Sequence, residues 1–156
     1  MSYARKDYVP GAPRPKVIRY TMGSSDEFEY SLSLVAKNPV KVTSRALESA
    51  RITANKYLES NLTRSNYRLQ ISVYPHEIIR EHKQMGFAGA DRLSQGMRKA
   101  FGRPTGRAAR LSQKQAILTV KVGKDNIDVA KTALIRASKK LPSKWNVQTS
   151  LEENIL

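Results

Sequence analysis

Positively charged side chains are the clearest indication of a chemical role in this chain. Residues 92–124 contain no Asp or Glu, yet they carry many cations: Arg92, Arg98, Lys99, Arg103, Arg107, Arg110, Lys114, Lys121 and Lys124. Cations this close together repel one another unless an anion lies beside them. Phosphate groups are strong partners for Lys and Arg, because they offer several acceptor oxygens together with a full charge. The stretch therefore predicts contact with the phosphate backbone of a nucleic acid.

Glycine and proline interrupt the first half of this basic stretch. Gly96, Gly102 and Gly106 occur there with Pro104, and no apolar period accompanies them. Glycine permits positive φ angles and a close approach of the backbone to a partner. The spacing matches neither a dinucleotide-binding fingerprint nor the phosphate-binding loop of nucleotide hydrolases. We therefore expect a flexible basic loop over about residues 86–111, and a loop of that length normally has a function.

Catalytic chemistry is not indicated. His76 and His82 stand six residues apart, which is not a zinc-ligand spacing, and no third ligand is evident. No serine occupies a Gly-x-Ser-x-Gly turn, and the chain contains no cysteine. The carboxylates are few and scattered among basic neighbours. We expect no catalytic residue, no metal site, no cofactor and no small-molecule substrate, and therefore a protein that is not an enzyme.

The overall charge supports the same interpretation. The chain has 28 basic and 13 acidic residues, a net charge of +15, and such an excess usually reflects an anionic partner. The alternative is a soluble protein that is merely basic. A length of 156 residues with 40% hydrophobic content suits a single domain. No apolar run approaches the roughly 20 residues of a membrane span, and no hydrophobic signal core begins the chain. We expect a cytoplasmic protein without a membrane partner.

Residues 1–16 are expected to form an extended basic arm. Three prolines remove backbone donors and stiffen this segment, and no apolar period is present. Its tyrosines could stack on bases while its charges meet phosphates. The charged residues of the arm are Arg5, Lys6, Arg14 and Lys16. Without a partner, we expect the arm to be disordered.

Alternating apolar residues predict the strands that must position these cations. The pattern is clear over about residues 28–36, 69–73, 116–122 and 145–149. A short extended piece is also indicated around Val40 and Val42. Residues 76–85 are ambiguous, because they fit either one helical turn or an extended edge.

Helical spacing predicts two amphipathic helices. The first begins near Ser44, with Thr43 or Ser44 as its N-cap, and its polar face carries Arg45, Glu48 and Arg51. The second begins after Asp125 or Asn126 and stops before Pro142.

The predicted fold is α+β. We expect a two-layer sandwich in which the two helices cover one side of a mostly antiparallel sheet. The domain would span residues 17–150 and would include the long basic internal loop. Residues 151–156 are expected to be a loose tail.

The residues of the loop also carry a family resemblance. The run at 89–110, Gly-Ala-Asp-Arg-Leu-Ser-Gln-Gly-Met-Arg-Lys-Ala-Phe-Gly-Arg-Pro-Thr-Gly-Arg-Ala-Ala-Arg, closely resembles the signature loop of a universal family of large-subunit ribosomal proteins. This family is called L-sixteen in bacteria and L-ten-e in archaea and eukaryotes. Further matches lie at residues 46–51, 54–57, 73–76, 15–20 and 26–28. The chain stops soon after Trp145, without the basic extension of eukaryotic members, so it resembles the archaeal form.

The resemblance implies a structural role in the ribosome. Members pack on large-subunit rRNA of the 23S type, near the central protuberance and beside the tRNA corridor. The loop of this chain would then reach toward the peptidyl transferase centre and help to position tRNA. Large-subunit rRNA, tRNA and neighbouring ribosomal proteins are the expected partners.

Two sets of site residues follow from the arm, the loop and the resemblance. The expected RNA-binding residues are Arg5, Lys6, Arg14, Lys16, Arg92, Arg98, Lys99, Arg103, Arg107 and Arg110. The residues expected to shape the loop or stack on bases are Gly96, Phe101, Gly102, Pro104 and Gly106. Two other functions are less consistent with the sequence. An RNA-modifying enzyme would need a cofactor pocket, and none is visible. A DNA-compacting protein would need a recognition helix, whereas both predicted helices are needed for the core.

Overall fold

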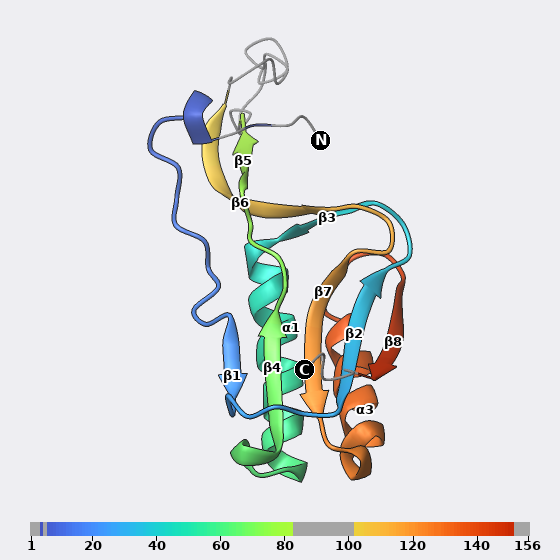
Figure 1. Ribbon diagram of the computed structural model, residues 1–156. Helices are drawn as coiled ribbons and strands as arrows, with labels where there is room; N and C mark the ends of the chain where they lie inside the picture. The colour runs from blue at the N-terminus through green and yellow to red at the C-terminus, as the bar shows by residue number, and fades with distance from the viewer. Residues whose placement is uncertain (1–3, 5, 83–101, 152–156) are drawn as a thin grey trace.

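The computed structural model describes residue 4, residues 6–82 and residues 102–151. This part of the chain folds into two antiparallel sheets and two helices (Figure 1). The larger sheet has the strand order β1 (Thr21–Gly23), β4 (Tyr67–Ile71), β7 (Ala116–Val122), β2 (Tyr30–Ala36) and β8 (Trp145–Leu151). The smaller sheet has the order β3 (Val40–Thr43), β6 (Arg103–Leu111) and β5 (Glu77–Glu81).

The two helices cover one face of the larger sheet, which confirms the predicted α+β sandwich (Figure 1). Helix α1 (Ser44–Asn61) follows Thr43, one of the two predicted N-cap residues. The Thr43 hydroxyl caps the helix, because it accepts a hydrogen bond from the Ala46 N–H at 3.2 Å. Helix α3 (Ile127–Ser138) follows a short 3-10 turn at Lys124–Asn126. Each helix contributes one apolar stripe to a shared core.

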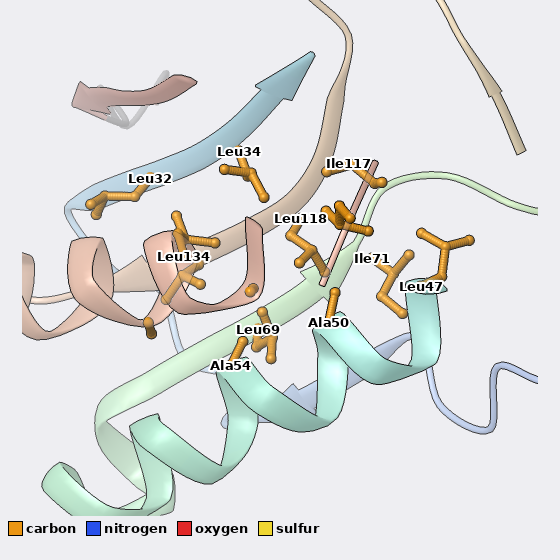
Figure 2. Close-up of a cluster of buried hydrophobic side chains, with 14 of the residues drawn as sticks. Leu32, Leu34, Leu47, Ala50, Ala54, Leu69, Ile71, Ile117, Leu118 and Leu134 are labelled. Carbon is orange, nitrogen blue, oxygen red and sulfur yellow. The ribbon is translucent and has the colours of Figure 1, made fainter. Parts of the chain in front are cut away.

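Side chains from both layers meet in this core. Figure 2 shows Leu134 of α3 beside Leu32 of β2, and Ala54 of α1 beside Leu69 of β4. All four residues are fully buried. Leu32 and Leu69 both pair with Val120 of the central strand β7, so their side chains lie in one row across the sheet. Burying a leucine side chain stabilises the fold by about 1.5–3 kcal/mol, and this row explains why the sheet alternation could be recognised in the sequence.

The predicted basic loop at residues 86–111 is wrong for its last part. Residues 103–111 form β6, which pairs with β3 through residues 108–111 and with β5 through residues 103–108. Ala108, Ala109 and Leu111 are buried there, but small side chains give a weak alternation that did not indicate a strand. The ambiguous segment at residues 76–85 supplies the partner strand β5, so its extended alternative is confirmed.

Pro104 and Gly106 therefore belong to a strand. Between Ile79 and Arg80 the register shifts, because Ile79 faces Gly106 while Arg80 faces Pro104, which leaves Thr105 as the extra residue of a bulge. β3 does not reach this end of β6, so Pro104 has a neighbouring strand on one side only, and proline is better tolerated there than inside a sheet. Lys41 of β3 forms an ion pair with the buried Glu77 of β5 across this sheet, at 2.6 Å.

The arm is more ordered than the sequence indicated. A 3-10 turn forms at Lys6–Tyr8, and Ala4 and Val9 are buried against Ile78 of β5 in a second, small apolar cluster. The Ile78 N–H donates to the Ala4 carbonyl at 3.0 Å. The arm thus packs on the smaller sheet and then runs down the side of the molecule to β1 (Figure 1). In the described residues no helix combines the length and apolar character needed to cross a membrane.

Candidate nucleic-acid interface

An open groove lies where the arm, the start of α1 and the β5–β6 hairpin meet. Its volume is about 480 Å³. The lining residues are Pro13, Arg14, Lys16, Thr43, Ser44, Arg45, Ile79, Glu81, Thr105, Gly106 and Arg107. Four separate segments of the chain therefore build one concave surface.

The charges of this groove are strongly unequal. Arg14, Lys16, Arg45 and Arg107 are basic, whereas Glu81 is the only carboxylate among the described residues of the lining. The first turn of α1 adds a partial positive charge, because backbone N–H groups at a helix start lack intrahelical partners. A concave wall with one sign of charge concentrates its field, so the groove attracts anions. Its size and openness suit a phosphate backbone that passes along the surface.

Arg107 ties the arm to the hairpin. Its Nε donates a hydrogen bond to the Pro13 carbonyl at 2.7 Å, and these two residues are 94 positions apart in the chain. The side chain is only partly exposed. Arg107 therefore has two roles in this region: it holds the arm in place and it contributes charge to the groove.

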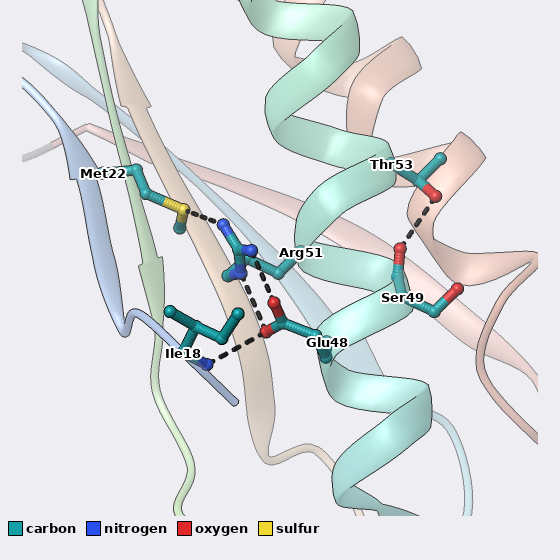
Figure 3. Close-up of polar contacts among 6 residues, drawn as sticks. All are labelled: Ile18, Met22, Glu48, Ser49, Arg51 and Thr53. Atoms are coloured by element: carbon teal, nitrogen blue, oxygen red, sulfur yellow. Dashed lines mark hydrogen bonds and ion pairs between the residues drawn. The ribbon is translucent and has the colours of Figure 1, made fainter. Parts of the chain in front are cut away.

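A buried ion pair holds residues 18–22, the segment that follows the arm, against α1 (Figure 3). Glu48 accepts hydrogen bonds from Arg51 Nε at 2.9 Å and Arg51 Nη2 at 2.6 Å, and its Oε2 also accepts from the Ile18 N–H at 3.3 Å. Arg51 Nη1 lies 2.9 Å from the Met22 sulfur. Both charged side chains are 12% exposed. The prediction that Glu48 and Arg51 belong to an outer polar face is therefore wrong, because residues 18–22 contact both side chains.

The ion pair also changes the acidity of its members. Hydrogen bonding from Arg51 is the main cause that lowers the pKa of Glu48 below its usual value, and it outweighs the opposing effect of burial. The same hydrogen bonds raise the pKa of Arg51. Glu48 consequently stays ionised and continues to anchor residues 18–22, which follow directly on the groove residues Arg14 and Lys16.

Only some of the predicted RNA-binding residues meet in the groove. Arg14, Lys16 and Arg107 line it together with Gly106. Arg103 and Arg110 lie on the same strand as Arg107 but outside the lining, and Lys6 lies in the 3-10 turn of the arm. The predicted residues that fall outside the described part of the chain are Arg5, Arg92, Gly96, Arg98, Lys99 and Phe101.

Gly102 and Gly106 of the predicted loop differ in whether their backbone conformation and surroundings require a glycine. Gly102, immediately before β6, has a φ of +101°, a conformation that favours glycine. A Cβ added to Gly106 would meet nothing within 4 Å. The fold therefore does not need a glycine at position 106, which lies in the lining of the groove.

Arg45 is the basic residue of the groove that was missing from the predicted RNA-binding residues. It was predicted on the polar face of the first helix, without a functional role. The available signal was its position directly after the N-cap residues, since a cation at a helix start is unfavourable unless an anion is also present. Within residues 4, 6–82 and 102–151, no group of three or more His, Cys, Asp or Glu could hold a metal ion.

The fold and the groove together are typical of a small basic protein that binds nucleic acid. Comparison with known families then defines the chain further. The family model described as ribosomal protein L16p/L10e matches residues 1–148. The chain belongs to this family, as its loop motif predicted.

Similar archaeal proteins support this membership. A protein named large ribosomal subunit protein uL16 from Staphylothermus marinus is 47% identical over 141 residues, which cover 90% of this chain and 81% of the relative. Its counterpart from Archaeoglobus fulgidus is 47% identical over 142 residues, covering 90% and 82%. The counterpart from Methanococcus maripaludis strain S2 is 48% identical over 143 residues, covering 91% and 83%. This chain is therefore an archaeal-type ribosomal protein of a structural, non-enzymatic family.

Proposed function

We propose that this protein, as a structural constituent of the cytoplasmic large ribosomal subunit, binds large-subunit rRNA through its basic groove. The observation that carries the proposal is the convergence of Arg14, Lys16, Arg45 and Arg107 on one concave surface. These cations come from the arm, α1 and β6, so a phosphate backbone in the groove would contact three elements at once. Each neutralised phosphate releases condensed counterions, which supplies most of the affinity.

The basic loop is proposed to extend this contact toward tRNA. Glu81 of β5 and Arg103 of β6 are cross-strand partners, so residues 82–102 leave and rejoin the smaller sheet at one place. Glu81 also lines the groove, and the loop therefore begins beside the surface proposed to hold rRNA. The family resemblance supports an extension toward the peptidyl transferase centre, near the central protuberance and the tRNA corridor.

Two variants with equal charge test the rRNA proposal. The first replaces three exposed groove residues: Arg14→Ala, Lys16→Ala and Arg45→Ala. The second removes the same charge from the outer side of α3 and the residues after it: Lys131→Ala, Lys139→Ala and Lys140→Ala, all exposed. Binding to deproteinised large-subunit rRNA is measured across a salt series.

The expected results separate a site from a general charge effect. If about six phosphates are neutralised, log affinity of the unmodified protein should fall with log salt at a slope of about −4 to −5. The groove variant should lose about 2 to 3 units of that slope, whereas the α3 variant should keep it. Equal losses in both variants would show that net charge, not the groove, binds the RNA.

The tRNA part needs assembled ribosomes. A photo-crosslinking residue is placed at position 99 in the loop and, as a control, at position 131 on α3. The proposal expects crosslinks from position 99 to the acceptor end of tRNA and none from position 131. Crosslinks from position 99 to rRNA alone would remove tRNA positioning from the function and leave rRNA binding intact.

A further inference from the structure

Three aromatic side chains form a cluster on the surface between β1 and β5. The rings of Tyr20 and Tyr74 stack with centroids 5.7 Å apart and an interplanar angle of 21°. The His76 ring lies 4.9 Å from Tyr74, tilted by 52°. Tyr20 precedes β1, whereas Tyr74 and His76 lie in the segment between β4 and β5.

The backbone of this segment explains why two rings face outward together. Burial alternates along it, because Val73 and Pro75 are buried while Tyr74 and His76 are exposed. In an extended chain, residues two positions apart point to the same side. Tyr74 is 42% exposed, an unusual position for a large ring that already has a stacking partner beneath it. Neither Tyr74 nor His76 belongs to the two apolar cores.

The cluster adjoins the basic groove along the β5–β6 pair. His76 directly precedes Glu77 of β5, and Glu77 faces Ala108 of β6, the residue after Arg107. Arg107 lines the groove. Cations for phosphates and rings for bases therefore lie side by side, which is the combination that proteins use for single-stranded nucleic acid.

We propose that Tyr74, which stacks on Tyr20 and contacts His76, is a stacking site for an unpaired nucleobase. This inference rests on the proposed function, because the base would belong to the RNA whose phosphates occupy the groove. A ring that its neighbours already orient loses little conformational freedom on binding. A paired base has both faces covered by its own helix, so an unpaired base is the partner that fits. Every base has a flat π face, and the site should therefore tolerate any base.

Two short probes separate the base from the phosphate. One is an oligoadenylate of about eight nucleotides, a length within the range of single-stranded binding sites. The other is an abasic oligomer of the same length and charge. The full-length chain should bind oligoadenylate about 5- to 100-fold more tightly than the abasic oligomer, the factor that stacking on one aromatic ring contributes.

Variants at position 74 then test whether the Tyr74 ring causes this preference. Tyr74→Phe keeps the flat ring and should keep the preference. Tyr74→Leu removes the π face and should lose most of the preference, with unchanged affinity for the abasic oligomer. If Tyr74→Leu lowers the stability of the fold, His76→Ala decides instead, and it should reduce the same preference severalfold because Tyr74 loses its neighbour.

Failure of the stacking site differs from failure of the groove. A preference that survives in Tyr74→Leu, or in His76→Ala where that variant decides, overturns the stacking site alone. Equal affinity of the unmodified chain for both oligomers does the same and leaves phosphate binding in place. If the unmodified chain binds neither oligomer at low salt, both the groove proposal and this inference are wrong.

Discussion

Arg51 donates two hydrogen bonds to Glu48, three residues earlier on α1, and the same carboxylate accepts the backbone N–H of Ile18. A single side chain thus connects a helix to the segment that follows the groove. Because the pair is largely buried, its loss leaves a charged or polar group without a partner.

Replacing Glu48 by Gln is therefore expected to destabilise the protein. Hydrogen bonds to charged groups contribute about 1.5–3 kcal/mol each, so the free energy of unfolding should fall by at least about 1.5 kcal/mol. Urea unfolding followed by circular dichroism measures the change. Glu59→Gln is the matched control, because Glu59 pairs with Arg64 at an exposed site and should change stability by less than about 1 kcal/mol. Similar losses in the two variants would contradict the anchoring role of Glu48.

The contribution of Glu48 should also depend on pH. Its pKa is lowered from the usual 4.5 in the folded protein, so folding favours the ionised form. The stabilisation is then fully present above pH 4.5 and is lost as the pH falls through the lower, folded pKa. The difference in unfolding free energy between the unmodified protein and Glu48→Gln should stay constant from neutral pH to about pH 5 and shrink below it. A difference that grows on acidification would reverse the assigned direction.

Two glycines should respond oppositely to alanine. Gly23 has a φ of +90°, and a Cβ there would lie 2.1 Å from the Tyr67 carbonyl oxygen. Gly23→Ala should therefore lower the unfolding free energy by more than about 1 kcal/mol. Gly106→Ala should leave it unchanged or raise it by up to about 1 kcal/mol, because its Cβ would meet nothing within 4 Å. Thermal unfolding of both variants gives the comparison, and a larger loss at position 106 would contradict the structure.

Neighbouring positions on α3 separate the core from the surface. Leu134 is fully buried, so Leu134→Ala should cost about 2–5 kcal/mol through lost burial and a residual cavity. Ile135, the next residue, is 44% exposed, and Ile135→Ala should cost less than about 1 kcal/mol. Denaturant midpoints measured under identical conditions test whether Leu134→Ala costs more stability than Ile135→Ala. Equal costs would mean that α3 presents a different face to the sheet.

Long periodic elements could be predicted from the sequence because each reveals one buried face. The alternation in β2 and β7 and the helical spacing of α1 and α3 all report contact with a single core. The smaller sheet gave a weaker signal, which was a short extended piece around Val40 and Val42 and an ambiguous segment at residues 76–85. Its strands β3 and β5 are short, and β6 buries small residues, so its pairing depends on contacts between distant segments.

The groove was predictable in charge but not in shape. Residues such as Arg14 and Arg107 could be recognised as cations for an anionic partner, yet nothing in their spacing indicates that they meet. Their approach depends on the Arg107–Pro13 hydrogen bond and on the Glu48–Arg51 pair beneath the arm. Glu48 and Arg51 resemble an ordinary surface pair at helical spacing, because the segment that covers them lies about thirty residues earlier.

The groove has a consequence for the synthesis of the protein itself. Its walls come from residues 13–16, 43–45, 79–81 and 105–107, so a growing chain cannot complete the groove before two thirds of its length has emerged. An unfinished or unfolded chain has many of the same charges but lacks the concave surface. Selective RNA contact through the groove would thus require a chain that is both complete to this point and folded.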